Sequence, residues 1–115
     1  MNAAEKLKRA LVAERGACDA GGFVDTPHGG GLEAHHVLHT KGHAVTAPQK
    51  RHLEDPVNVA LLCHRHHGEL QHSKAFRAYW KQRAVELYGV DQVVAYIDGW
   101  PTKVKSYRTR SVDDQ

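Results

Sequence analysis

The spacing of apolar residues near the N-terminus predicts a helix over residues 3–15. Apolar side chains there form one stripe among charged ones, and the helix is expected to end at Gly16. The stripe consists of Leu7, Ala10 and Leu11. Residues 16–31 are rich in glycine, which favours loops and turns over regular structure.

Two short apolar runs in the middle of the chain predict strands. They are LEAHHVL over residues 32–38 and VNVALLC over residues 57–63. The segment between them, residues 40–56, is polar and basic and contains two prolines, so we expect an exposed connecting loop. After the second strand, the run from His64 leads into a helix, although Gly68 weakens helix propensity there.

The C-terminal third predicts two more helices, which makes the expected fold class α+β. Ser73 can cap a helix that runs to about Tyr88 and stops at Gly89. Its expected core positions are Phe76, Tyr79, Trp80, Ala84 and Leu87. A shorter helix is expected over residues 91–98, ended by Gly99. The remaining tail, residues 101–115, is basic through Lys103, Lys105, Arg108 and Arg110.

Length and composition restrict the possible classes of protein. At 115 residues the chain has room for one domain, residues 1–115, with one modest core. The hydrophobic fraction of 41% and the charged fraction of 25% are typical of a globular protein. No run has the apolar length of a signal peptide or membrane helix, so we expect a cytoplasmic protein without a membrane partner. The net charge of +3 gives a weak preference for a polyanionic partner.

Histidine is the residue type that points to chemistry. All ten histidines fall between His28 and His72. His35 and His36 are adjacent in the first predicted strand, so their side chains diverge and a division into one metal ligand and one base is chemically reasonable. His67, early in the following helix, could supply a second metal ligand.

The segments LEAHHVLHT and DPVNVALLCHRHH resemble the His-Asn-His (HNH) endonuclease family. The resemblance implies a ββα-metal motif, with a long loop between two antiparallel strands, over about residues 18–72. It also implies roles for four residues: His35 and His67 as metal ligands, His36 as general base, and Asn58 as the asparagine of the family name. Asn58 taken alone could be a turn residue after Pro56, since asparagine is common in turns.

The implied reaction is hydrolysis of DNA phosphodiester bonds, by nicking or double-strand cleavage. A neutral imidazole such as that of His36 can take a proton from the attacking water. One divalent ion, Mg²⁺, Mn²⁺, Ni²⁺ or Zn²⁺, would stabilise the charge on the phosphate and the leaving oxygen. Asn58 is not titratable, so its expected role is to bond the backbone or imidazole that orients His36.

Many members of this family add a structural zinc held by two C-x-x-C pairs. Cys63 and His66 fit the second pair and Cys18 fits the start of the first, but its partner position is Gly21, which cannot ligate. His28 could supply the fourth ligand, because tetrahedral zinc accepts mixtures of cysteine and histidine. The alternative is a decayed site in which both cysteines are small buried hydrophobes. For a third metal histidine, the family position is Gln71, and on a regular helix His72 would point about 100° away.

The expected partner is DNA, contacted by basic residues that include Arg65 and Lys74. A charged helix face is as often simply solvated, so the two interpretations remain open for this set. The basic set is Arg65, Lys74, Arg77, Lys81 and Arg83. Phage DNA-packaging proteins are further expected partners by analogy with small family members. The rival hypothesis is a catalytically silent, zinc-binding DNA or protein adaptor.

Overall fold

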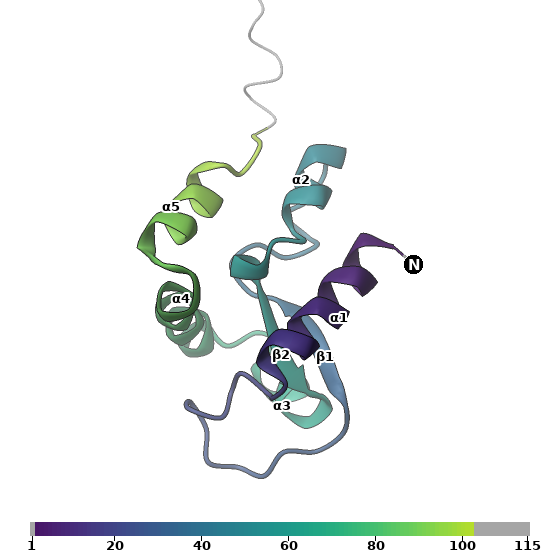
Figure 1. Cartoon of the computed structure of the whole chain (residues 1–115), viewed down its shortest axis with the longest axis vertical. Helices are drawn as coiled ribbons and strands as arrows, with labels where there is room; N and C mark the ends of the chain where they lie inside the picture. The colour runs from purple at the N-terminus through teal and green to yellow at the C-terminus, as the bar shows by residue number, and fades with distance from the viewer. Residues whose placement is uncertain (1, 103–115) are drawn as a thin grey trace, which may run out of the picture.

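Two short antiparallel strands lie at the centre of the structure, a computed structural model that describes residues 2–102 (Figure 1). Its elements are α1 (Ala3–Arg15), β1 (Leu32–His36), α2 (Ala47–His52), the 3₁₀ turn η1 (Pro56–Asn58), β2 (Val59–Cys63), α3 (His64–Leu70), α4 (Lys74–Tyr88) and α5 (Val90–Asp98). The predicted α+β class is therefore confirmed at the level of a two-stranded sheet with helices. The basic residues expected in the tail lie beyond residue 102, outside the described part.

The strands pair so that their two faces meet different helices. Leu32 pairs with Cys63 at one end and His36 with Val59 at the other. On one face α1 crosses the sheet, and α4 and α5 lie to the other side (Figure 1). The α1 side buries Leu11, Val59 and Leu61, and the α4 side buries Ala60, Leu62, Phe76 and Trp80. Covering both faces explains why all five residues of β2 are buried, as its continuous apolar run indicates.

Helices α1 and α4 begin and end close to the predicted positions, and capping residues explain why. Asn2 and Glu5 form a reciprocal capping box at the start of α1, and Gly16 ends it with φ of 70°. Ser73 accepts the backbone N–H of Phe76 at the start of α4. Leu87 was expected in the core but is 39% exposed, because α4 buries a narrower face than the apolar spacing suggested.

The segment expected to be an open loop, residues 40–56, contains the helix α2. Thr46 and Gln49 form a capping box at its N-terminus. Pro48 stands in the first turn, where a missing N–H costs no helical hydrogen bond, so proline here begins a helix instead of excluding one.

Both strands are shorter than predicted. β1 ends at His36, although the N–H of Val37 still donates to the carbonyl of Asn58. At the partner end, residues 56–58 form a 3₁₀ turn whose N-cap Asp55 accepts the N–H of Val57. Within residues 2–102, every helix is too short or too polar to cross a membrane.

Candidate metal centres and catalytic pocket

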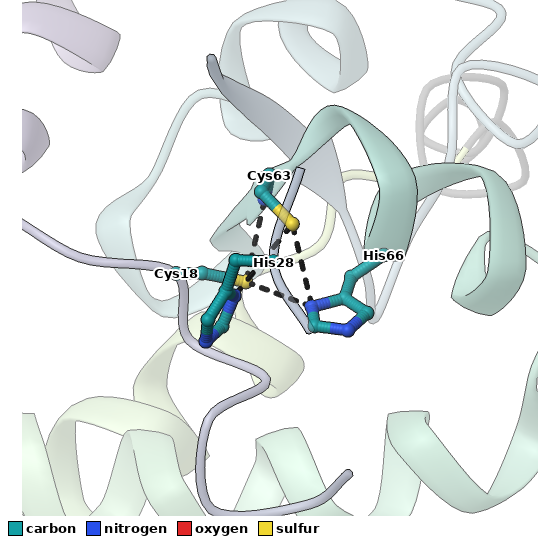
Figure 2. Close-up of side chains that lie close together, drawn as sticks. All are labelled: Cys18, His28, Cys63 and His66. Carbon is teal, nitrogen blue, oxygen red and sulfur yellow. Dashed lines mark hydrogen bonds between the residues drawn. The ribbon is translucent and has the colours of Figure 1, made fainter. Parts of the chain in front are cut away.

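Four side chains from distant parts of the chain converge beside the end of β2 (Figure 2). They are Cys18 and His28 from the loop between α1 and β1, Cys63 at the end of β2, and His66 in the first turn of α3. One ligand atom from each lies within 4.8 Å of all the others. This cluster of two cysteines and two histidines could hold a metal ion such as Zn²⁺.

The separations between these ligand atoms fit a tetrahedral ion. The Sγ–Nδ1 distances are 3.6 Å for Cys18 and His66, 3.3 Å for Cys63 and His66, and 3.7 Å for Cys63 and His28. Zinc lies about 2.3 Å from sulfur and about 2.0 Å from nitrogen, which in a tetrahedron places the two ligands about 3.6 Å apart. The cluster is therefore close to the size that zinc requires.

The loop that carries His28 is tied to the start of α3 by backbone contacts. The N–H groups of His64 and Arg65 donate to the carbonyls of Gly31 and Gly29. Gly30 has φ of 82°, and a Cβ there would lie 2.6 Å from the Cβ of His64. Only glycine fits at this position, because a side chain would be strained and would push the loop away from the cluster.

Hydrogen bonds favour the thiolate form of Cys63 and set which nitrogen of His66 carries its proton. Burial raises the pKa of Cys63, but the N–H groups of Gly29 and His66 together with His28 and Cys18 outweigh it and lower that pKa to about 6. Burial raises the pKa of Cys18. The Nε2 of His66 lies 2.9 Å from Thr26 Oγ1, so donation to this hydroxyl leaves Nδ1 with the lone pair that faces both sulfurs.

The two histidines predicted as catalytic-metal ligands, His35 and His67, lie side by side. Their ring centroids are 5.0 Å apart, with Phe76 packed beside His35. Burial, followed by the charges of His67, His36 and His72, lowers the pKa of His35 to about 4. The imidazole of His35 is therefore neutral near pH 7, which is the form that binds metal.

Glu33 is a residue at this pair that the sequence analysis missed. His67 Nδ1 donates to Glu33 Oε1 at 2.7 Å, which leaves the lone pair of His67 on Nε2. Bonds from His67 and from His64 lower the pKa of Glu33. The signal was available, because Glu33 precedes His35 by two residues in a strand and so shares its face.

His36 lies on the opposite face of β1, as predicted, in a pair with Glu54. Its Nε2 is 3.0 Å from Glu54 Oε2, and the two side chains are only 14% and 18% exposed. A carboxylate accepts hydrogen bonds, so Nε2 carries the proton and Nδ1 is the acceptor nitrogen. Glu54 had no signal in the sequence, because it lies 18 residues away in the segment expected to be loop.

A surface pocket of about 500 Å³ joins these groups at the end of β1. We call it the histidine pocket, and it is lined by His35, His36, Glu54, His67, Gln71 and His72 among others. The expectation that His72 would point away is wrong. It assumed a continuing helix, whereas α3 ends at Leu70 and the chain turns there, which brings His72 to the pocket wall.

Asn58 is fully buried and holds the chain that follows β1. Its Oδ1 accepts the N–H groups of Leu38 and His39, each at 2.8 Å. Its Nδ2 donates to the carbonyls of His39 and Leu53. Asn58 thereby joins the segment after His36 to the segment before Glu54, and it bonds backbone rather than either imidazole.

The two residues predicted to contact nucleic acid occupy different places. Arg65 pairs with Glu69 at 3.1 Å beside the loop that carries His28. Lys74 is exposed at the start of α4 and lines two further pockets, one of which shares His35, His36 and His72 with the histidine pocket.

The chain matches no known family model, no curated protein and no solved structure.

Proposed function

We propose that this protein is a metal-dependent endonuclease of the HNH type that hydrolyses phosphodiester bonds in DNA. The observation that carries the proposal is the histidine pocket, in which the pair His35 and His67 and the hydrogen-bonded pair His36 and Glu54 border one cavity. The order β1, β2, α3, with the first two antiparallel, supports a ββα-metal arrangement around it.

In the proposed reaction, His36 acts as general base. Its Nδ1 takes the proton of the attacking water, and Glu54 keeps the ring oriented and stabilises the imidazolium that forms. His35 and His67 would hold a divalent ion, which would supply Lewis-acid stabilisation of the charge that develops on the phosphate and the leaving oxygen. Two protein ligands leave coordination positions for water and substrate, as a catalytic site requires. Asn58 holds the backbone on both sides of the base.

We further propose that Zn²⁺ occupies the Cys18, His28, Cys63, His66 cluster and has a structural role. All four positions of a tetrahedral ion are taken by protein ligands, which leaves none for substrate. The ion would link the loop before β1 to the start of α3, and His67 follows His66 directly. The site would thus brace the helix that carries a catalytic-metal ligand.

The direct test is cleavage of supercoiled plasmid by purified protein across Mg²⁺, Mn²⁺, Ni²⁺ and Zn²⁺, with nicked and linear products measured separately. We expect metal-dependent loss of the supercoiled form. Absence of cleavage with all four ions would overturn the proposal.

Replacing Glu33 by glutamine should weaken catalytic metal binding. The orienting carboxylate of His67 is lost, and loss of such a partner typically costs about 10–100-fold in metal affinity. The measurement is the metal concentration that gives half-maximal plasmid cleavage. Glu69→Gln, an exposed change on α3, is the matched control and should leave that concentration unchanged. Equal values for both variants would argue against a metal on His67.

A second candidate function is a catalytically silent zinc-binding adaptor. It is favoured by the fact that, among the described residues, only Cys18, His28, Cys63 and His66 form a group of three or more potential ligands whose ligand atoms all lie within 4.8 Å of one another. A protein that binds stoichiometric zinc and DNA, yet never cuts DNA with any divalent ion, would establish this alternative.

A further inference from the structure

Two further hollows follow the histidine pocket along α4. The next hollow, of about 120 Å³, shares His35, His36 and His72 with the histidine pocket and adds Lys74 and Arg77. A third, of about 380 Å³, shares Lys74 and Arg77 with the second and reaches Lys81. We call the second and third hollows together the α4 groove. Shared lining residues place the three hollows next to one another in a row that begins at the histidine pocket.

The charge of the α4 groove is strongly positive. Lys74, Arg77 and Lys81 all line it, and their spacing places them on one side of α4. Among the described residues that line the groove there is no carboxylate. Arg77 is anchored, since its Nη2 donates to the carbonyl of Leu38 at 2.9 Å. The groove therefore presents cations to solvent without a neutralising side chain in its wall.

Other basic residues near the strands are already engaged. Arg65 pairs with Glu69, and Arg83 pairs with the buried Asp19. The ion pairs formed within residues 2–102 include none of the three groove cations. In α3 and α4, Arg65 and Arg83 thus form ion pairs with carboxylates. Lys74, Arg77 and Lys81 form none within the described residues, and they make a row that begins beside the histidine pocket.

The length of the row matches a short piece of nucleic-acid backbone. Lys74 and Lys81 are seven residues apart, which is about 10 Å along a helix axis. A strand of duplex DNA carries one phosphate about every 3.4 Å of axis, so this length spans about three phosphates. The number of cations in the row therefore equals the number of phosphates that a strand of this length carries.

We infer that the α4 groove binds the phosphates of duplex DNA adjacent to the scissile one, through Lys74, Arg77 and Lys81. This inference rests on the proposed nuclease function for the position of the scissile phosphate. The contacts are to backbone, so they position the duplex without reading its sequence. The groove is the substrate track, and it leads one strand into the histidine pocket.

The test is DNA binding by an inactive protein that cannot cut. In the His36→Ala background, affinity for a fluorescent duplex is measured by anisotropy over a series of NaCl concentrations, without added catalytic metal or chelator. Lys74→Gln/Lys81→Gln should lower affinity roughly tenfold or more and reduce the slope of log K against log[salt] by about two. Both lysines are exposed, so the melting temperature should not change.

Lys8→Gln/Lys50→Gln is the matched control. These lysines are exposed on α1 and α2, outside the histidine pocket and the α4 groove, and the net charge changes equally. If both double variants weaken binding alike, or if the His36→Ala protein does not bind duplex at all, the inference is wrong. A third outcome separates the two proposals. If only Lys74→Gln/Lys81→Gln weakens binding, but the parent protein never cleaves plasmid, the α4 groove is a DNA-binding surface and the nuclease proposal is wrong.

Discussion

Replacing His36 by alanine is expected to slow metal-dependent plasmid cleavage by roughly 10²–10⁴-fold, the usual contribution of a general base. His36 is the residue whose acceptor nitrogen remains available at the histidine pocket, because its Nε2 is engaged by Glu54. The residue lies at the end of a strand, and its side chain is not in either hydrophobic core cluster. The melting temperature and zinc content should therefore stay close to those of the parent.

His43→Ala is the matched control for this change. His43 is exposed and does not line the histidine pocket, so its removal should leave the cleavage rate close to that of the parent protein. Cleavage by His36→Ala protein at the parent rate would show that another group activates the water. Glu54→Gln should give a smaller loss than His36→Ala, since in the proposed reaction Glu54 orients His36 and stabilises its protonated form but does not itself take the proton of the water.

If zinc occupies the cluster of Cys18, His28, Cys63 and His66, its removal is expected to destabilise the fold strongly. An ion held at a free concentration of a thousand times its Kd stabilises the native state by about 4 kcal/mol. For a domain of about 100 residues, this corresponds to a fall in melting temperature of roughly 15–30 °C when a chelator is added. We expect one zinc per chain by elemental analysis, and recovery of the melting temperature when zinc is restored.

His28→Ala separates a bound ion from ordinary packing at this cluster. His28 is exposed, so without a metal its removal should cost little stability, whereas with a metal it deletes one of four ligands. In the His28→Ala protein, zinc affinity and the melting temperature should both fall sharply. In the His43→Ala control, both should equal those of the parent protein. A His28→Ala protein with unchanged zinc content and melting temperature would exclude His28 as a ligand.

Local sequence signals were sufficient to predict most elements of secondary structure. Asn2 and Ser73 cap helices through their own side chains, and Gly16 ends α1 because it can adopt positive φ. Strand alternation placed His35 and His36 on opposite faces of β1, and the packing of the two cores agrees. Each of these features depends on residues that are a few positions apart in the chain. Over that range, a sequence pattern predicts local structure directly.

The error at α2 has the same local character. Pro48 considered alone favours a loop, but a proline is compatible with the first turn of a helix, and the Thr46–Gln49 capping box is a signal that a helix begins there. The helix was therefore predictable in principle. The contact between Glu54 and His36 was not predictable, because it depends on the path of the chain after α2.

The sequence by itself determined the types of chemistry available: adjacent histidines in a strand, a further histidine and an asparagine at fixed spacing, and two cysteines. Only the tertiary structure decided which groups meet. It brought His28 to Cys63 in place of the missing ligand at Gly21, placed Glu33 and Glu54 against the two imidazoles, and turned His72 into the histidine pocket. Contacts across such sequence separations depend on how loops close and pack against the sheet, and that is set by the whole fold, not by local propensity.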